Sequence, residues 1–292
     1  MPDDARLAVR RTPKLYIGGA FPRSESGRTD AVTGADGEVL AHVARASRKD
    51  LREAVTAAHK AWPGWRARTG YNRGQICYRV AELLEGRSEQ LVEEVRAAEG
   101  VRKKAAGEQV AAAIDRWVWY AGWTDKLAQV DGAANPVAGP YFNFSVPEPT
   151  GVVGVVAPQS SSLLGLTSLV APAIVPGNVA VVLASSTRPL PAVTLSEVLV
   201  AADVPGGVVN LLTGRLGELA PVLAGHLDVH ALDLTGLAGT DVDAAGLAVE
   251  AAESVKRVRT PPREEPDWRA TPSPRVMLEF TETKTVWHPV GV

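Results

Sequence analysis

The sequence PTGVVGVVAP, residues 149–158, contains an uncharged run of small and β-branched residues between two prolines. A second run of this kind, VAVVL, follows a Pro-Gly-Asn turn at residues 179–183. Short apolar runs of this composition are typical of strands that are buried on both faces of a parallel sheet. Further strands are expected at residues 208–212 and 231–234, with a helix at residues 192–202 before them. The alternation of strands and helices predicts an α/β fold with a Rossmann-like parallel sheet.

A helical section is expected before this sheet. Ser47 and Asp50 have the spacing of a capping box, which starts a helix that Pro63-Gly64 is expected to end. The spacing of apolar residues predicts three more helices. They are expected near residues 76–84, 88–99 and 107–127. Strands are also expected at residues 14–19, 141–146 and 276–287, the last of them closing the chain.

One apolar segment resembles a membrane span in length. Leu163–Leu183 contains no charged residue, but Pro172 and the run Pro176-Gly177-Asn178 interrupt it, so a buried helix, a turn and a buried strand are expected. The net charge of −2 gives no overall attraction to nucleic acid or anionic membrane. The single cysteine excludes an intrachain disulfide and fits a reducing compartment. The sequence therefore predicts a cytoplasmic protein with neither a nucleic-acid nor a membrane partner.

Several segments resemble those of the aldehyde dehydrogenase family, and they occur in the family's order. They are Asp50–Trp65, Tyr120–Leu127, Pro149–Pro158, Pro176–Leu183, Val204–Gly214, His226–Gly236 and Glu279–Val286. The resemblance implies a Rossmann-like coenzyme domain with N-terminal helices and a β oligomerisation arm. Shared ancestry does not by itself establish activity, because function depends on the site rather than on the fold.

The resemblance also implies a division of the chain. Residues 1–139 would form the helical part of the coenzyme domain, 140–149 the first part of the arm, and 150–258 the Rossmann-like part. Residues 259–274 would be a linker in place of the family's catalytic domain, and 275–292 the C-terminal oligomerisation strand. That linker is rich in Pro, Arg and Glu. The chain thus resembles a truncated family member that lacks the catalytic domain.

The residues that the family uses for catalysis are not matched. The family needs a thiolate nucleophile, whereas Cys77 lies in a predicted helix and is expected to be a packing residue. The family's Glu-Leu-Gly-Gly-Lys motif is missing after Ser254–Val258. Gln159 and Ser160 stand where the family has the Trp-Asn pair that stabilises the oxyanion, and loss of such a donor costs about 3 kcal/mol. No catalytic residue is predicted.

Coenzyme contacts are also reduced. Ala184–Thr187 replaces the family's Lys-Pro-Ser-Glu, so both charged partners of the adenosine ribose are gone. Leu237 replaces the serine of a Gly-Ser pair at the pyrophosphate, where it is expected to remove a polar contact and to crowd the site. No cofactor is therefore expected, with NAD(P) as the alternative. The remaining candidates for cofactor binding are Gly214, Gly217, Thr235 and Gly236.

Other chemistries find little support. Ser160–Ser162 lacks the Gly-x-Ser-x-Gly context of a serine hydrolase. His226 and His230 have a spacing that would join two imidazoles on a helix, but they fall in an expected turn and strand. No metal site is predicted.

Three functions follow from these observations. The first is a catalytically inert subunit that assembles with a full-length aldehyde dehydrogenase through Phe142–Val146 and Glu279–Trp287. The second is a subunit of an NAD(P)-dependent aldehyde oxidoreductase that shares an active site with its partner. The third is a stand-alone nucleotide-binding or sensor module.

Overall fold

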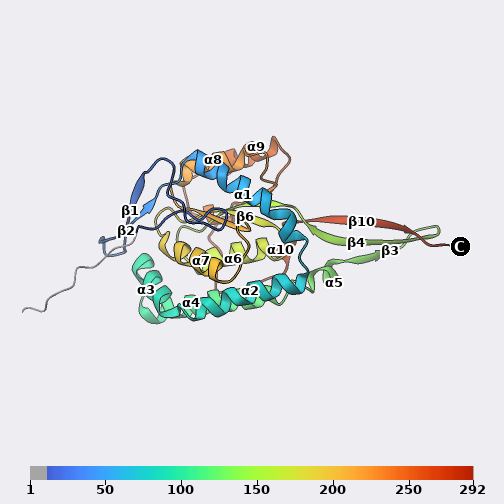
Figure 1. The fold of residues 1–292 in the computed structure, drawn as a ribbon, viewed down its shortest axis with the longest axis horizontal. Coiled ribbons are helices and arrows are strands. Elements are labelled where there is room, and N and C mark those ends of the chain that lie inside the picture. The colour runs from blue at the N-terminus through green and yellow to red at the C-terminus, as the bar shows by residue number, and fades with distance from the viewer. Residues whose placement is uncertain (1–11, 292) are drawn as a thin grey trace, which may run out of the picture.

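A five-stranded parallel sheet lies at the centre of the body in the computed structural model, which describes residues 12–291 (Figure 1). Its strand order is β7-β6-β5-β8-β9. The strands are β5 (Val152–Val156), β6 (Val179–Leu183), β7 (Val209–Leu212), β8 (Ala231–Asp233) and β9 (Arg257–Arg259). The first four confirm the predicted strands, and the parallel sheet confirms the predicted fold. The sequence does not predict β9, because its single valine between two arginines gives no apolar run.

Helices cover both faces of the sheet (Figure 1). One face is covered by α1 (Arg48–Arg66), α8 (Leu216–Ala224) and α9 (Ala244–Ala252). The other is covered by α6 (Leu164–Ile174) and α7 (Leu190–Ala201). An outer layer of α2 (Gly70–Glu85), α3 (Ser88–Glu99) and α4 (Lys103–Ala121) packs on α6 and α7. A hairpin that the sequence does not predict, β1 (Thr29–Thr33) and β2 (Val39–Ala44), lies beside this body.

The predicted start of α1 is confirmed and its predicted end is wrong. Ser47 Oγ accepts hydrogen bonds from the amides of Lys49 and Asp50, and the Asp50 carboxylate accepts one from the Ser47 amide at 2.7 Å. The helix continues through Pro63 to Arg66. Buried Trp65 donates from Nε1 to the carbonyl of Ile174 at 2.9 Å, which holds this last turn against α6.

Three other predicted elements differ from the structure. The fourth helix, expected at residues 107–127, begins at Lys103 and ends at Ala121, and a separate α5 (Leu127–Asp131) follows. Residues 14–19 form only isolated bridges, including one between Tyr16 and Leu211 at the edge of β7. The closing strand, expected at residues 276–287, is preceded by α10 (Arg275–Leu278), and β10 spans Thr281–Pro289. Met277 and Phe280 are buried, so packing against the body favours the helix here.

The apolar segment Leu163–Leu183 forms a buried helix, a turn and a buried strand, as predicted. The turn is fixed by the buried side chain of Asn178. Its Oδ1 accepts from the Gly151 amide at 2.8 Å, and its Nδ2 donates to the carbonyls of Ala173 at 3.0 Å and Phe280 at 2.9 Å. No helix within residues 12–291 has the length and apolar character that crossing a membrane requires.

A three-stranded antiparallel sheet, called the arm below, projects from the body (Figure 1). Its strand order is β10-β4-β3, with β4 at Tyr141–Pro149 and β3 at Ala133–Asn135. β10 pairs with β4 along its whole length, from Thr281 opposite Pro149 to Pro289 opposite Tyr141. The two segments expected to form an arm therefore lie side by side, although they are far apart in the sequence.

The backbone of Val255 has a strained conformation, and relieving it is expected to raise the free energy of unfolding. It has φ +55° and is 91% exposed in the turn before β9. A β-branched residue costs about 1–2 kcal/mol in the left-handed region, where asparagine is better tolerated. Val255→Asn is expected to raise the free energy of unfolding by about 1 kcal/mol in urea denaturation. Val249→Asn is the control because Val249 is 68% exposed within α9. An equal effect of both substitutions would contradict the assignment of strain.

Candidate functional site

The carboxyl ends of β5, β6, β7 and β8 lie at one edge of the sheet, where α/β proteins bind ligands. An open cleft of about 1060 Å³ lies at this edge. Its walls come from the segments after β5, β6 and β7, from α8 and α9, and from the loop between Gly239 and Asp243. This cleft is the candidate functional site.

Gln159 ties together the loops that follow β5 and β6. Its Nε2 donates to the carbonyl of Ala157 at 2.8 Å, and its Oε1 accepts from the Ser186 amide at 2.9 Å. Ser160, which the sequence comparison predicts at an oxyanion position, donates its hydroxyl hydrogen to the carboxylate of Glu265. Its carbonyl accepts a hydrogen bond from Arg188. Both residues are thus engaged within the chain.

The residues after β6 and β7 also bind one another. Ser186 Oγ donates to the Gly214 carbonyl at 3.0 Å and accepts from the Leu216 amide at 3.2 Å. Gly214 has φ +148°, which explains a glycine there by backbone conformation alone. Gly217 lines the cleft.

After β8 the chain forms a short 3₁₀ helix, Thr235–Leu237, in which all three residues are buried. A Cβ at Gly236 would lie 2.2 Å from the Val156 carbonyl oxygen, so close packing of the backbone requires glycine. Leu237 is 3% exposed and packs in the core. The expectation that it crowds the cleft is therefore wrong, because its side chain turns inward.

The structure does not bring the four predicted coenzyme residues together. Gly214 and Gly217 follow β7, whereas Thr235 and Gly236 follow β8, and the strands β6 and β5 lie between them. Gly217 is the member of this set that lines the cleft within the described chain.

Acidic side chains outnumber basic ones in the cleft. Glu218, Asp241, Asp243 and Glu250 line it together with Arg215, so its described lining carries four negative charges and one positive charge. Asp243 also caps α9, because its Oδ1 accepts from the Gly246 amide at 2.9 Å. The helix end that would attract an anion is therefore already occupied by a carboxylate of the chain.

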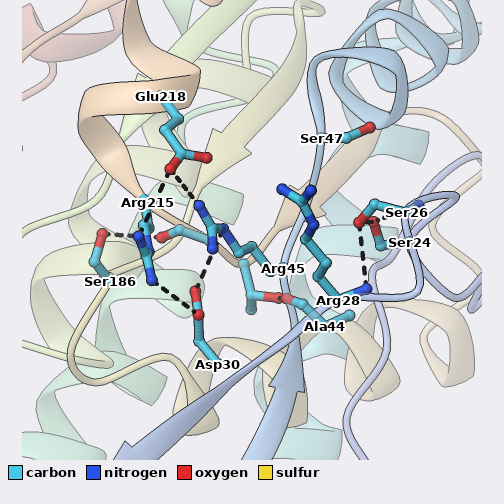
Figure 2. A network of polar contacts seen from close by, with 12 residues as sticks. Ser24, Ser26, Arg28, Asp30, Ala44, Arg45, Ser47, Ser186, Arg215 and Glu218 are labelled. Atoms are coloured by element: carbon cyan, nitrogen blue, oxygen red, sulfur yellow. Dashed lines mark hydrogen bonds and ion pairs between the residues drawn. The ribbon is translucent and has the colours of Figure 1, made fainter.

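The arginine of the cleft belongs to a balanced ionic network (Figure 2). Arg215 lies 3.4 Å from Asp30 and 3.8 Å from Glu218. Arg45 contacts the same two carboxylates, with 3.9 Å to Asp30. Two cations and two anions neutralise one another, so Arg215 contributes little uncompensated positive charge to the cleft. The sequence does not reveal this arrangement, because the four residues come from β1, the end of β2, and α8 with its preceding turn.

Cys77 lies far from this edge, inside α2. It is 1% exposed, and burial raises the pKa of its thiol to about 12, against a smaller opposing effect of Arg73. The thiol is therefore protonated at neutral pH. It packs in the hydrophobic core.

Arg259 ends β9, and the segment that follows it, residues 260–274, lies against the body. The Arg116 guanidinium donates to the carbonyls of Trp268 at 2.5 Å and Ala270 at 3.1 Å. Trp268 Nε1 donates to Glu265 at 2.7 Å, and Glu265 in turn accepts from Ser160. This segment therefore binds Ser160, which remains exposed, and its Trp268 lies against Gly165 at the start of α6.

His230 links β5 to the turn before β8. Its Nδ1 accepts from the Val152 amide at 2.9 Å, and its ring lies 5.7 Å from that of Trp62. His226 likewise accepts through Nδ1, from the Asp228 amide at 3.2 Å. Within residues 12–291 no group of three or more His, Cys, Asp and Glu side chains is arranged to hold a metal ion.

The hydrogen bond between the Val152 amide and His230 predicts that the free energy of unfolding depends on pH. Burial, followed by the nearby His59, lowers the pKa of His230 below its ordinary value of 6.5. The unfolded chain thus takes up this proton first as the pH falls, and stability is lost below about pH 6.5. His230→Asn keeps an acceptor for Val152 and is expected to reduce the loss between about pH 8 and about pH 5 in urea denaturation. His42→Asn is the control, because His42 is exposed on β2 and is not among the groups that lower the pKa of His230. An unchanged acid-side loss in His230→Asn would exclude His230 as its source.

The comparisons with known proteins agree with this architecture. The profile of the aldehyde dehydrogenase family matches residues 21–260. The putative aldehyde dehydrogenase DhaS of Bacillus subtilis is 32% identical over 86% of this chain and 50% of its own length. The mitochondrial benzaldehyde dehydrogenase of Antirrhinum majus is 32% identical over 84% of this chain and 46% of its own length. The chain spans about half the length of these curated relatives.

Solved structures give the same result. The structure of an aldehyde dehydrogenase from Bacillus cereus with NAD⁺ has a TM-score of 0.79 and 27% identity, and the match covers 85% of this chain and 50% of that one. HpcC from Thermus thermophilus has a TM-score of 0.79 and 29% identity, over 85% of this chain and 47% of that one. On the sequence match and the fold together, the chain belongs to the aldehyde dehydrogenase family.

Proposed function

We propose that this chain is a catalytically inert subunit that assembles with a full-length aldehyde dehydrogenase through its arm. The observation that carries this proposal is the projecting arm on a chain that has only segment 260–274 between β9 and α10. In the family, by resemblance, an arm docks on the sheet of a neighbouring catalytic domain. A second copy of this chain offers no such domain in that segment, so the receiving subunit would be a longer relative.

The surface of the arm supports a docking role. Phe142, Phe144 and Val146 alternate along β4 and therefore share one face of the sheet. Val286 lies opposite Phe144, and the rings of Phe142 and Phe144 are 5.5 Å apart. Phe142 remains 51% exposed. A clustered apolar face on a narrow sheet is typical of a protein interface.

Strand addition gives a further means of association. β10 has nine residues and pairs along one edge with β4, while its other edge pairs with no strand in the described part of the chain. A partner strand added there gains backbone hydrogen bonds. Lys284 already pairs with Glu148 at 2.8 Å across the arm, so a partner strand meets no unpaired lysine charge at that position.

Catalytic inertness is supported by the state of the chemical groups. The only cysteine is buried as a thiol, and the Ser160 hydroxyl is engaged by Glu265. These features also disfavour the alternative of a shared active site, because such a site needs a residue of this chain, and both side chains are already held within it. The alternative of a nucleotide-binding module is motivated by the volume of the cleft, but its excess of carboxylates repels phosphates.

The proposal is tested by co-expression. The tagged chain is produced together with a full-length aldehyde dehydrogenase from the same genome, and both the recovered stoichiometry and the aldehyde-dependent NADH formation are measured. Stoichiometric recovery is expected, and no NADH is expected when the partner's catalytic cysteine is replaced by alanine. Activity in that mixture would favour a shared active site, and failure of every full-length homologue to associate would sink the proposal.

The cleft leads to a separate prediction for the coenzyme. Titration of the isolated chain with NAD⁺ or NADP⁺ in a calorimeter is expected to show no saturable binding at millimolar concentration, because carboxylates outnumber the single arginine in the lining. A full-length homologue under the same conditions is the positive control. Saturable binding in the micromolar range would contradict this prediction and favour the nucleotide-binding alternative.

A further inference from the structure

A second pocket lies beside the β1–β2 hairpin and shares no lining residue with the acidic cleft. Its volume is about 330 Å³. Buried Pro13, Ser24 and Ala44 contribute to its wall, and the exposed residues Lys14, Arg23 and Arg28 contribute its charges. We propose that this pocket binds a phosphate oxyanion, of the phosphomonoester class.

The charge of the lining is entirely positive. Three cations and no carboxylate belong to it, in a chain whose net charge is −2. Within residues 12–291, the side chains of Lys14, Arg23 and Arg28 form no ion pair or hydrogen bond. Three like charges around one hollow make its local potential positive, which attracts anions.

Two carboxylates adjoin Ser24 of the pocket, and both bind other groups. Asp50 accepts from Ser24 Oγ at 2.7 Å and from the Ser47 amide at 2.7 Å, as part of the cap of α1. Glu25 accepts from Ser47 Oγ at 3.0 Å and lies 3.9 Å from Lys49. Neither side chain forms an ion pair with a cation of the pocket within residues 12–291.

The contrast with the adjoining network is visible in Figure 2. On one side of β2, Arg45 and Arg215 are matched by Asp30 and Glu218, with dashed contacts between them. On the other side, the guanidinium of Arg28 extends on the side of Ser47 and no contact is drawn to it. Two arginines in the same region thus have partners, whereas Arg28 presents unused donors.

The geometry favours a small phosphorylated ligand over a nucleotide. Arginine forks bind phosphate oxygens through paired N–H groups, and lysine adds a point charge. A volume of about 330 Å³ is at the lower limit of small-molecule sites. The hydroxyls of Thr12 and Thr29, which also line the pocket, provide hydrogen bonds for the organic part of a phosphomonoester.

Calorimetric titration of the full chain with glycerol 3-phosphate, and separately with inorganic phosphate, tests the proposal at low ionic strength. Saturable binding of one equivalent is expected, weakening as salt is added. Arg23→Gln/Arg28→Gln is expected to reduce the affinity at least about tenfold, because charge-assisted hydrogen bonds are lost. Lys104→Gln/Arg263→Gln removes two exposed cations elsewhere and is expected to bind as the unmodified chain does.

A variant Asp3→Asn/Asp4→Asn removes the carboxylates that precede the pocket in the sequence. The proposal is supported if the unmodified chain or this variant binds either phosphate compound and if Arg23→Gln/Arg28→Gln loses that binding. Tighter binding of glycerol 3-phosphate than of phosphate identifies the ester as the ligand class, and equal binding identifies the anion alone. The proposal is overturned if neither the unmodified chain nor the aspartate variant binds. It is also overturned if Arg23→Gln/Arg28→Gln binds as well as the control Lys104→Gln/Arg263→Gln. None of these results affects the proposed assembly through the arm.

Discussion

Replacing Asn178 with alanine is expected to lower the free energy of unfolding by about 4 kcal/mol. The side chain satisfies three backbone groups at once, the Gly151 amide and the carbonyls of Ala173 and Phe280. Asn178 is fully buried, so water does not replace these partners in the folded chain. Each buried polar group left without a partner costs about 1–3 kcal/mol.

The same contact connects distant parts of the chain. Gly151 precedes β5, Ala173 lies near the end of α6, and Phe280 immediately precedes β10. The loss is therefore expected to affect both the sheet and the base of the arm. Urea denaturation measures it, with Asn72→Ala as the control, since Asn72 lies on α2 and bonds to Arg68 at the surface. A loss in Asn178→Ala no larger than in the control would contradict this role.

Substitution of two aromatic residues in the arm is expected to abolish assembly with a full-length homologue. Phe142→Ser/Phe144→Ser removes the paired rings from the apolar face of β4. Aromatic anchors at interface centres contribute about 2 kcal/mol each, so two of them correspond to a loss of affinity of at least about a hundredfold. The affinity of the purified subunits, measured by calorimetry, tests this expectation.

The matched control is Tyr71→Ser/Tyr78→Ser on α2. Tyr71 is 66% exposed and Tyr78 is 50% exposed, which is comparable with the 51% of Phe142. This pair lies on the body rather than on the arm. Both double variants are expected to unfold at similar denaturant concentrations. Undiminished affinity in the arm variant, or an equal loss in the control, would contradict docking through the arm.

The elements that the sequence predicts well are those in which local composition and tertiary burial agree. Val179–Leu183 is a short apolar run between turn residues, and it is buried throughout in β6. Ser47 and Asp50 form their capping box within a few residues, so no distant contact is needed to specify it. In contrast, β9 and the end of α1 depend on remote partners. Arg259 is held by Asp233 at 3.2 Å, and Trp65 by the carbonyl of Ile174.

In the candidate site, too, some features follow from local sequence and others depend on remote contacts. The loss of the catalytic cysteine and of the ribose ligands is predicted from positions that match the family in the sequence, and it stays a prediction. The acidic character of the cleft is not predicted, since Glu218 and Glu250 come from different helices and Asp241 from a loop between them. The sequence position of Leu237 predicts a place in the cleft, but the direction of its side chain depends on the 3₁₀ helix after β8.

The most direct test of the proposed function is the native mass of the assembly formed by this chain and a full-length aldehyde dehydrogenase from the same genome. Mass spectrometry under non-denaturing conditions counts the copies of each subunit. The account predicts a species that contains both chains and disappears with Phe142→Ser/Phe144→Ser. Observation of the two proteins only as separate species, with this chain alone or bound to itself, would contradict it.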